Sequence, residues 1–135
     1  MSTEATLAAL YIEISARQNR IVYVGEMWTW VKKRTVGPCD YSTNRFEYNS
    51  EVNDWLAEIT ASNRREGAPL LAAFVMQGGH PKKVHLTNFR RACEAYWGTP
   101  LPIFSTRNAD AIAHTQRQAW RRVWDGTMLL KTVSP

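Results

Sequence analysis

The sequence predicts a mostly helical α+β protein that contains a small β-sheet. An apolar run, Pro69–Gln77, lies in mid-chain between Gly67 and the pair Gly78-Gly79. A run of this length between turn residues is typical of a strand that is buried on both faces. Four or five other segments carry the apolar spacing of amphipathic helices, which would cover such a strand. We therefore expect an α+β fold built around residues 69–77.

Length and composition indicate an ordinary globular protein. The 135 residues predict a single domain, residues 1–135, that buries roughly two thirds of its unfolded surface. No apolar stretch is long enough to cross a bilayer, and residues 1–4 show no secretory signal. Cys39 and Cys93 are too few for a disulfide framework. We therefore expect a cytoplasmic protein with reduced thiols and no membrane association.

The first 34 residues predict two helices separated by a short strand. The first helix spans about residues 4–18 with Thr3 as its N-cap. Its apolar stripe consists of Leu7, Leu10, Tyr11 and Ile14. Residues 21–23 are β-prone, and a second helix follows over about residues 25–34. The apolar stripe of this helix consists of Val24, Met27, Trp28 and Val31.

The next helix is the most regular of the chain. Residues 35–49 show no sustained period and predict a long surface loop, after which Ser50 begins a helix that ends at Gly67. The apolar stripe of this helix consists of Val52, Trp55, Leu56 and Ile59. Its opposite face is small and polar and consists of Asn53, Ala57, Thr60, Ala61 and Arg64.

Two further helices follow the central run and the turn at residues 78–81. One has Thr87 as its cap and Gly98 as its stop, and it buries Phe89, Ala92, Cys93 and Tyr96. Residues 99–105 contain two prolines and are expected to be extended. The last helix spans about residues 108–125 and ends at Gly126. Its expected buried residues are Ile112, Ala119, Trp120, Val123 and Trp124.

This order of elements is compatible with a winged helix-turn-helix core followed by additional C-terminal helices. Specific residues also fit a winged-helix pattern, namely Ile21-Val22-Tyr23, Gly25-Glu26, Val52 and Pro69 through Val75. With this pattern, about residues 5–80 resemble the DNA-binding domain of the alkylguanine-DNA alkyltransferases and alkyltransferase-like proteins. The pattern is also similar to that of small uncharacterised bacterial and phage proteins with a Trp-rich C-terminal helix. The resemblance implies a winged-helix fold that binds DNA.

Two departures from the alkyltransferase pattern concern its chemistry. The family carries Pro-Cys-His-Arg just after its strand, whereas residues 76–80 of this chain are Met-Gln-Gly-Gly-His. Cys39 does follow a proline, but it precedes the third helix. The arginine that the family places at the start of its recognition helix is also absent, because residues 50–52 are Ser-Glu-Val. We therefore expect a DNA-binding scaffold without alkyl transfer.

The charge of the chain suggests where DNA would bind. A formal net charge of +5 indicates an anionic partner, and nucleic acid is the commonest one. Asparagine and arginine read base edges and small residues allow close approach, so the predicted groove residues are Asn53, Ala57, Thr60 and Arg64. The predicted phosphate contacts lie in a turn and near a helix start: Lys82, Lys83, Arg90 and Arg91. Solvated charge is the alternative interpretation of both sets.

A second functional hypothesis is a protein-binding module, such as a mobile-element or phage accessory protein. Exposed aromatic residues are common anchors of protein interfaces. Trp30 lies off the apolar stripe of its helix, and Trp97 lies at a helix end. The predicted partner-binding residues are Trp30, Tyr41, Phe46, Tyr48 and Trp97.

Motifs for catalysis and metal binding are missing from the sequence. The cysteines and histidines show no C-x2-C, H-x3-H or H-E-x-x-H spacing, so we expect neither a metal nor a cofactor. Residues 85–87, His-Leu-Thr, match half of the two-histidine phosphoesterase pattern, but the second half is absent. Neither a nucleophile elbow nor a phosphate-binding loop occurs. The expected function is therefore non-catalytic binding, with an enzyme that no motif marks as the remaining alternative.

Overall fold

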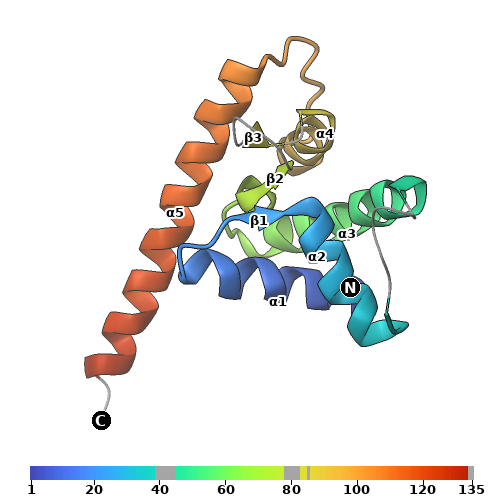
Figure 1. Ribbon diagram of the computed structural model, residues 1–135. Helices are drawn as coiled ribbons and strands as arrows, with labels where there is room; N and C mark the ends of the chain where they lie inside the picture. Colours follow the sequence, from blue (N-terminus) through green and yellow to red (C-terminus); the bar gives the residue numbers. More distant parts are fainter. Residues whose placement is uncertain (39–44, 78–82, 85, 134–135) are drawn as a thin grey trace.

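The computed structural model describes residues 1–38, 45–77, 83–84 and 86–133. The helices are α1 (Thr3–Arg17), α2 (Val24–Thr35), α3 (Arg45–Glu66), the 3-10 helix η1 (Leu71–Phe74), α4 (Leu86–Trp97) and α5 (Thr106–Val133). The strands are β1 (Val22–Tyr23), β2 (Val75–Gln77) and β3 (Lys83–Val84). Figure 1 shows the helices arranged around the short strands. The predicted class, mostly helical α+β, is confirmed.

Helix α1 forms where the sequence predicts it, but it buries a different face. Its N-cap is Ser2 rather than Thr3, because the Ser2 hydroxyl accepts the N–H of Ala5 at 3.1 Å. The buried residues are Ala5, Ala8, Ile12, Ser15 and Ala16. The predicted stripe is wrong at Leu10 and Ile14, which are 46% and 42% exposed, whereas Leu7 and Tyr11 pack partly buried against the core. Small alanines let α1 lie close against α2, α3 and η1.

The three strands form one sheet in the order β1-β2-β3. Strand β1 is parallel to β2, with Val22 opposite Val75, and β2 is antiparallel to β3, with Met76 opposite Val84. The short β1 follows from the β-prone residues that the sequence indicates. Strand β3 was not expected, because residues 83–84 carry too little apolar pattern to predict a strand.

The central run is buried as expected but is only partly a strand. Leu70 through Val75 are all buried. Residues 71–74, however, form the 3-10 helix η1, so the prediction of a continuous strand over 69–77 is wrong. A buried backbone needs partners for its polar groups, and here side chains of α3 and α5 supply them instead of a neighbouring strand. The bonded pairs are Leu70 N–H with Gln116 (2.8 Å), Leu71 N–H with Asn63 (3.0 Å) and Ala73 C=O with Arg117 (2.9 Å).

Helices α2 and α3 pack through the stripes that the sequence predicts. The buried residues are Val24, Met27, Trp28 and Val31 on α2, and Val52, Trp55, Leu56 and Ile59 on α3. The start of α3 is Arg45 rather than Ser50, so the expected loop over residues 35–49 is shorter at its C-terminal end. Lys32 joins three helices, because its ammonium contacts Glu4 of α1 at 2.9 Å and Glu51 of α3 at 2.6 Å.

Helix α4 closes the core beside α3. Phe89, Ala92 and Cys93 are buried as predicted, and burial raises the pKa of the Cys93 thiol to about 12. The helix begins at Leu86, so Thr87 lies inside its first turn and not at the cap. It ends at Gly98, whose φ of 68° is a left-handed conformation that favours glycine.

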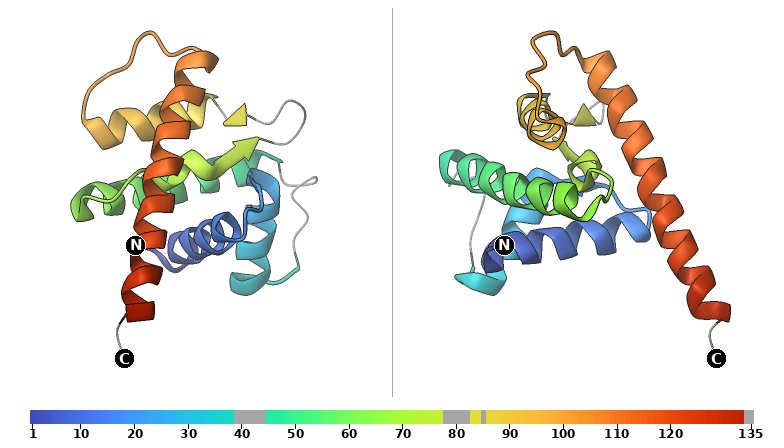
Figure 2. Two further views of the ribbon diagram at one scale, coloured as in Figure 1. Left: turned by 90° about the vertical axis from the view of Figure 1, so that its left-hand side faces the viewer. Right: turned by 180° about the vertical axis from the view of Figure 1, so that it is seen from behind.

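Helix α5 is longer than the sequence predicts. It continues through Gly126 to Val133, because a glycine weakens a helix by about 1 kcal/mol and does not by itself end it. Its buried residues among those described are Ala109, Ala113 and Trp124, whereas Val123 is 46% exposed, contrary to the prediction. Figure 2 shows that the C-terminal end of α5 projects beyond the other helices.

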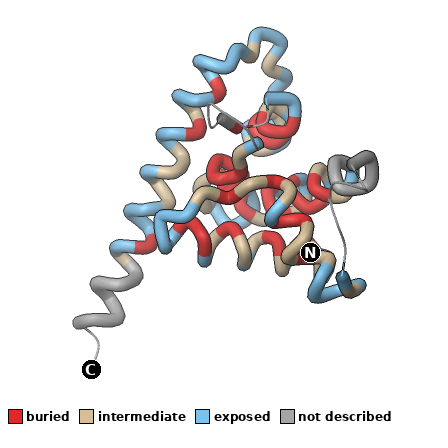
Figure 3. Tube along the Cα trace, in the orientation of Figure 1, coloured by how far each residue is buried: buried red, intermediate tan, exposed pale blue. Residues whose placement is uncertain are grey.

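One hydrophobic core connects these elements. Buried positions gather where α1, α2, α3 and η1 meet, and they continue to the inner sides of α4 and α5 (Figure 3). Trp28, Ile12, Met27 and Leu70 are among the largest fully buried side chains.

Candidate functional site

Three of the predicted DNA-contacting residues come together in a groove between α3 and α4. The groove has a volume of about 170 Å³. Its lining residues are Asn53, Asp54, Leu56, Ala57, Asn88, Arg91, Ala92 and Ala95. Asn53, Ala57 and Arg91 were predicted from the sequence, and two different helices place them side by side. Asp54 was not predicted, and it adds a negative charge to the same groove.

Thr60 does not belong to the exposed face of α3, so its predicted role in a DNA groove is wrong. It is 0% exposed, because α4 packs along this side of α3 and the small residues between the helices permit close approach. The exposed residues of α3 whose side chains are described are Ser50, Asp54, Ala57, Ala61, Arg64, Arg65 and Glu66. The outward face of α3 is therefore rotated relative to the prediction.

Arg64 lies where the C-terminal ends of α3 and α4 meet. Its Nη1 donates to the carbonyl oxygen of Ala95 at 3.3 Å, and its guanidinium lies 3.4 Å from the point where a side chain at Gly98 would begin. The free carbonyl groups at a helix C-terminus attract a cation. Arg64 is thus held at one end of the α3–α4 groove, with most of its five donors still available.

The predicted phosphate contacts have different surroundings. Arg90 is half-buried and pairs with Glu94 at 3.2 Å, and Glu94 also accepts the N–H of Leu101 at 3.0 Å. Arg91 is exposed and has no ion-pair partner within the described ranges. Lys82 and the side chain of Lys83 lie outside the described residues, although the backbone of Lys83 belongs to β3.

The predicted partner-binding residues do not form one site among the residues that the structure describes. Trp97 is 46% exposed at the end of α4 and contacts Tyr96 edge-on, with 5.0 Å between ring centroids. Trp30 is half-buried on α2. Tyr41 and the side chains of Phe46 and Tyr48 lie outside the described residues.

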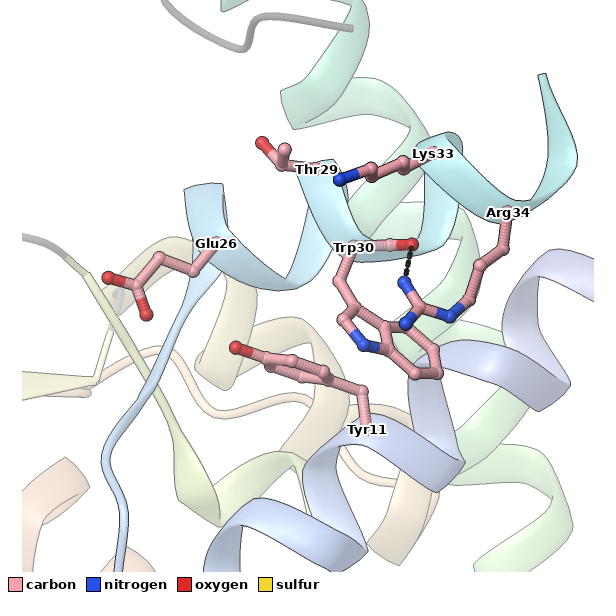
Figure 4. A pocket seen from close by; sticks show the side chains of 6 residues that line it. All are labelled: Tyr11, Glu26, Thr29, Trp30, Lys33 and Arg34. Carbon is pink, nitrogen blue, oxygen red and sulfur yellow. Dashed lines mark hydrogen bonds between the residues drawn. The ribbon is translucent and has the colours of Figure 1, made fainter. Parts of the chain in front are cut away.

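Trp30 forms part of a larger cleft between α1 and α2. The cleft has a volume of about 660 Å³, and its lining residues are Tyr11, Glu26, Thr29, Trp30, Lys33 and Arg34. Figure 4 shows that Tyr11 comes from α1 and that α2 supplies the other side chains. The Trp30 ring lies between Tyr11, with centroids 5.2 Å apart, and the guanidinium of Arg34, 3.7 Å from the ring centroid. The indole is therefore fixed in place.

The electrostatics of this cleft change along α2. Glu26 lies at one end, and Lys33 and Arg34 lie at the other (Figure 4). Burial, assisted by the charge of Glu26, raises the pKa of the Tyr11 hydroxyl, while Arg20 and Ser15 oppose this shift. Tyr11, like any tyrosine near neutral pH, is protonated and offers a hydrogen-bond donor to the cleft.

Sequence reasoning missed this cleft for two reasons. Tyr11 was assigned to the buried stripe of α1, and Trp30 was considered alone rather than with its helical neighbours. A usable signal was present, because residues 26, 29, 30 and 33 follow the i, i+3, i+4, i+7 spacing of one helix face. Both the cleft and the α3–α4 groove offer contacts for non-covalent binding.

The chain has no match among known proteins in three comparisons. Searches against protein-family models, curated proteins and solved structures each gave none. Within the described residues, no three histidine, cysteine, aspartate or glutamate side chains gather where they could hold a metal ion. None of the described helices combines the length and apolar character needed to cross a lipid bilayer.

Proposed function

We propose that the protein binds double-stranded DNA without catalysis, through a winged-helix-like arrangement of α3, α4 and the β2–β3 strands. The contact region would be the outer side of α3 and α4, called here the α3–α4 surface. It consists of Asn53, Ala57, Ala61, Arg64, Arg65 and Arg91. The observation that carries the proposal is that Asn53, Ala57 and Arg91 line one groove between α3 and α4, while Arg64 of α3 donates to the carbonyl oxygen of Ala95 on α4.

The charges of this surface suit a polyanion. Arg65 and Arg91 are exposed and have no ion-pair partner in the described part of the chain, and the guanidinium of Arg64 donates to the carbonyl oxygen of Ala95. Arginine donates in a planar fork that fits phosphate oxygens. Ala57 and Ala61 between them have short side chains, which would let the DNA backbone approach the helix closely.

The order of elements also supports the proposal. Helix, strand, helix, helix, 3-10 helix, strand and strand follow each other from α1 to β3, an order compatible with a winged helix-turn-helix. Strands β2 and β3 are antiparallel neighbours, and Lys82 and Lys83 occur in the chain at the start of β3 or just before it. The proposal keeps Lys82 and Lys83 as phosphate contacts.

Removing two of the arginines tests the proposal directly. We expect the double variant Arg65→Ala and Arg91→Ala to bind duplex DNA more weakly for every sequence tested. The slope of log affinity against log salt should fall by about 2, since each phosphate contact contributes about 0.9. Fluorescence anisotropy of a labelled duplex at about 50 and about 200 mM salt measures this slope.

The matched control removes the same charge elsewhere. Arg20→Ala with Arg122→Ala takes two exposed arginines from the α1 and α5 side, and this variant should keep nearly the wild-type slope. If both double variants lose affinity equally, net charge and not the α3–α4 surface is responsible. If the wild-type protein binds no duplex at low salt, the proposed function is wrong.

Removing the negative charge of Asp54 is expected to strengthen DNA binding, in contrast to removing the arginines. Its carboxylate lies in the groove with Arg91 and would repel DNA phosphates, so Asp54→Asn should strengthen binding by roughly threefold at low salt. Asp125→Asn on α5 removes an equal charge from an exposed position and should have little effect. The same anisotropy titration compares the two variants. Weaker binding by the Asp54 variant would contradict contact between this groove and phosphate.

The protein-binding hypothesis remains a prediction with less support. Its two described tryptophans, Trp30 and Trp97, belong to different helices and do not line a common cavity among the described residues. The cleft at Trp30 supports a separate inference.

A further inference from the structure

The outer face of α2 carries opposite charges at its two ends. Glu26, Thr29, Trp30 and Lys33 lie along this face, while Met27, Trp28 and Val31 point into the core. Seven residues separate Glu26 from Lys33, which corresponds to about 10 Å along a helix. Trp30 and Thr29 occupy the middle. The face is therefore negatively charged in the first turn of α2, neutral in the middle and positively charged in the last turn.

Neither terminal charge is neutralised by another residue that the structure describes. Glu26 and Lys33 are exposed and form no ion pair within the described residues. Lys32, one residue away, contrasts with them because it contacts two carboxylates. The charges of the outer face are thus available to another molecule.

Helix α1, which supplies Tyr11 to the cleft, also exposes apolar side chains. Leu10 and Ile14 of this helix are 46% and 42% exposed. Trp30 is held rigidly between Tyr11 and Arg34. A fixed indole beside exposed aliphatic residues is typical of the centre of a protein interface.

We propose that a second copy of this chain docks on the outer face of α2 by two-fold symmetry. If two α2 helices lie antiparallel, with the axis between Thr29 and Trp30, Glu26 of each copy faces Lys33 of the other. A two-fold interface must be self-complementary, and this charge order meets that condition. An acidic peptide or a nucleic acid would match the cations at one end of this face but not Glu26 at the other, whereas a copy of the chain matches both ends.

Charge reversal tests the proposed contact. Sedimentation velocity from micromolar to submillimolar protein should show a reversible dimer of the wild-type chain. The single variants E26K and K33E should each weaken it by at least about tenfold, because symmetry makes two pairs repulsive at once. The double variant E26K/K33E should regain the dimer, since the reversed charges again face their opposites.

Mixing the two single variants gives a sharper result. The E26K copy presents two cations and the K33E copy two carboxylates, so an equimolar mixture should form a heterodimer although each variant alone stays monomeric. This outcome also shows that both variants are folded. The controls E66K and R122E make equal charge changes on α3 and α5 and should leave dimerisation unchanged.

Three outcomes would overturn the proposal. They are a wild-type chain that is monomeric over the whole range, single variants that dimerise like the wild type, and a mixture that forms no heterodimer. The measurement contains no DNA, so its result is independent of the α3–α4 surface and of the function proposed for it.

Discussion

Replacing Trp28 by alanine is expected to lower the free energy of unfolding by about 3–5 kcal/mol. The side chain is 1% exposed and packs in the centre of the core. Its Nε1 donates to Glu51 at 3.2 Å, so truncation removes a hydrogen bond as well as apolar contacts. A loss of this size approaches the total stability of many small domains. Guanidinium denaturation followed by circular dichroism measures the change.

Two further variants make the Trp28 result interpretable. Trp28→Leu keeps much of the volume and should lose less stability, which provides a value even if the alanine variant is unfolded. Trp97→Ala removes the same side chain from a position that is 46% exposed, and it should change stability by less than about 1 kcal/mol. Equal losses at the two positions would contradict the burial that the structure assigns to Trp28.

The second large effect is expected at Lys32, where methionine should lower the free energy of unfolding by about 1–3 kcal/mol. The substitution keeps the apolar stem but removes the ammonium that Glu4 and Glu51 share. Two carboxylates of α1 and α3 would then face each other without a counter-ion in a partly buried position. Lys33→Met, at an exposed neighbour, should cost no more than about 0.5 kcal/mol at the same low protein concentration.

The contribution of Lys32 also has a defined pH dependence. Desolvation by itself would lower the pKa of Lys32, but the hydrogen bonds to Glu51 and Glu4 outweigh it and raise the pKa above its ordinary value. A group whose pKa is raised by folding stabilises the folded state fully below its unfolded pKa, about 10.4 for lysine. This stabilisation is lost as the pH rises through the higher pKa that Lys32 has in the folded state.

Stability curves of the wild type and the Lys32→Met variant should therefore differ by a constant amount between about pH 7 and 9 and converge above about pH 10.5. Ionisation of the Cys93 thiol in the unfolded state affects both proteins and cancels in the difference. A difference that grows at alkaline pH would contradict the ion pairs drawn between Lys32 and its two glutamates.

Large apolar residues at helical spacing made much of the fold predictable. Trp28 and Val31 on α2, and Trp55 and Ile59 on α3, are buried as the sequence indicates. The same reasoning failed on α1, where two apolar stripes compete and the alanine stripe is the buried one. Which stripe faces inward depends on how closely the neighbouring helices approach, and the sequence of α1 alone does not contain that information.

Non-local hydrogen bonds explain the other errors. Residues 71–74 form a turn because Asn63, Gln116 and Arg117 supply the backbone partners that a strand neighbour would otherwise provide. These side chains are distant in sequence, so a local pattern cannot reveal them. Thr60 is buried for a similar reason, since its surroundings depend on α4, which follows it by more than twenty residues. The candidate groove was accordingly predicted only in part, through Asn53, Ala57 and Arg91.

The segment from Leu70 to Val75 has a consequence for how the chain acquires its structure. The 3-10 helix η1 contacts α1, α3, α4 and α5, and strand β2, which follows it directly, contacts α2. A nascent chain that has emerged only as far as α3 lacks the piece on which all five helices pack. Folding must therefore wait for contacts between residues far apart in the chain, which slows it relative to a simple bundle of local helix pairs. Proteolytic cleavage within this segment would separate α1, α2 and α3 from α4 and α5 and would divide the piece on which both groups pack.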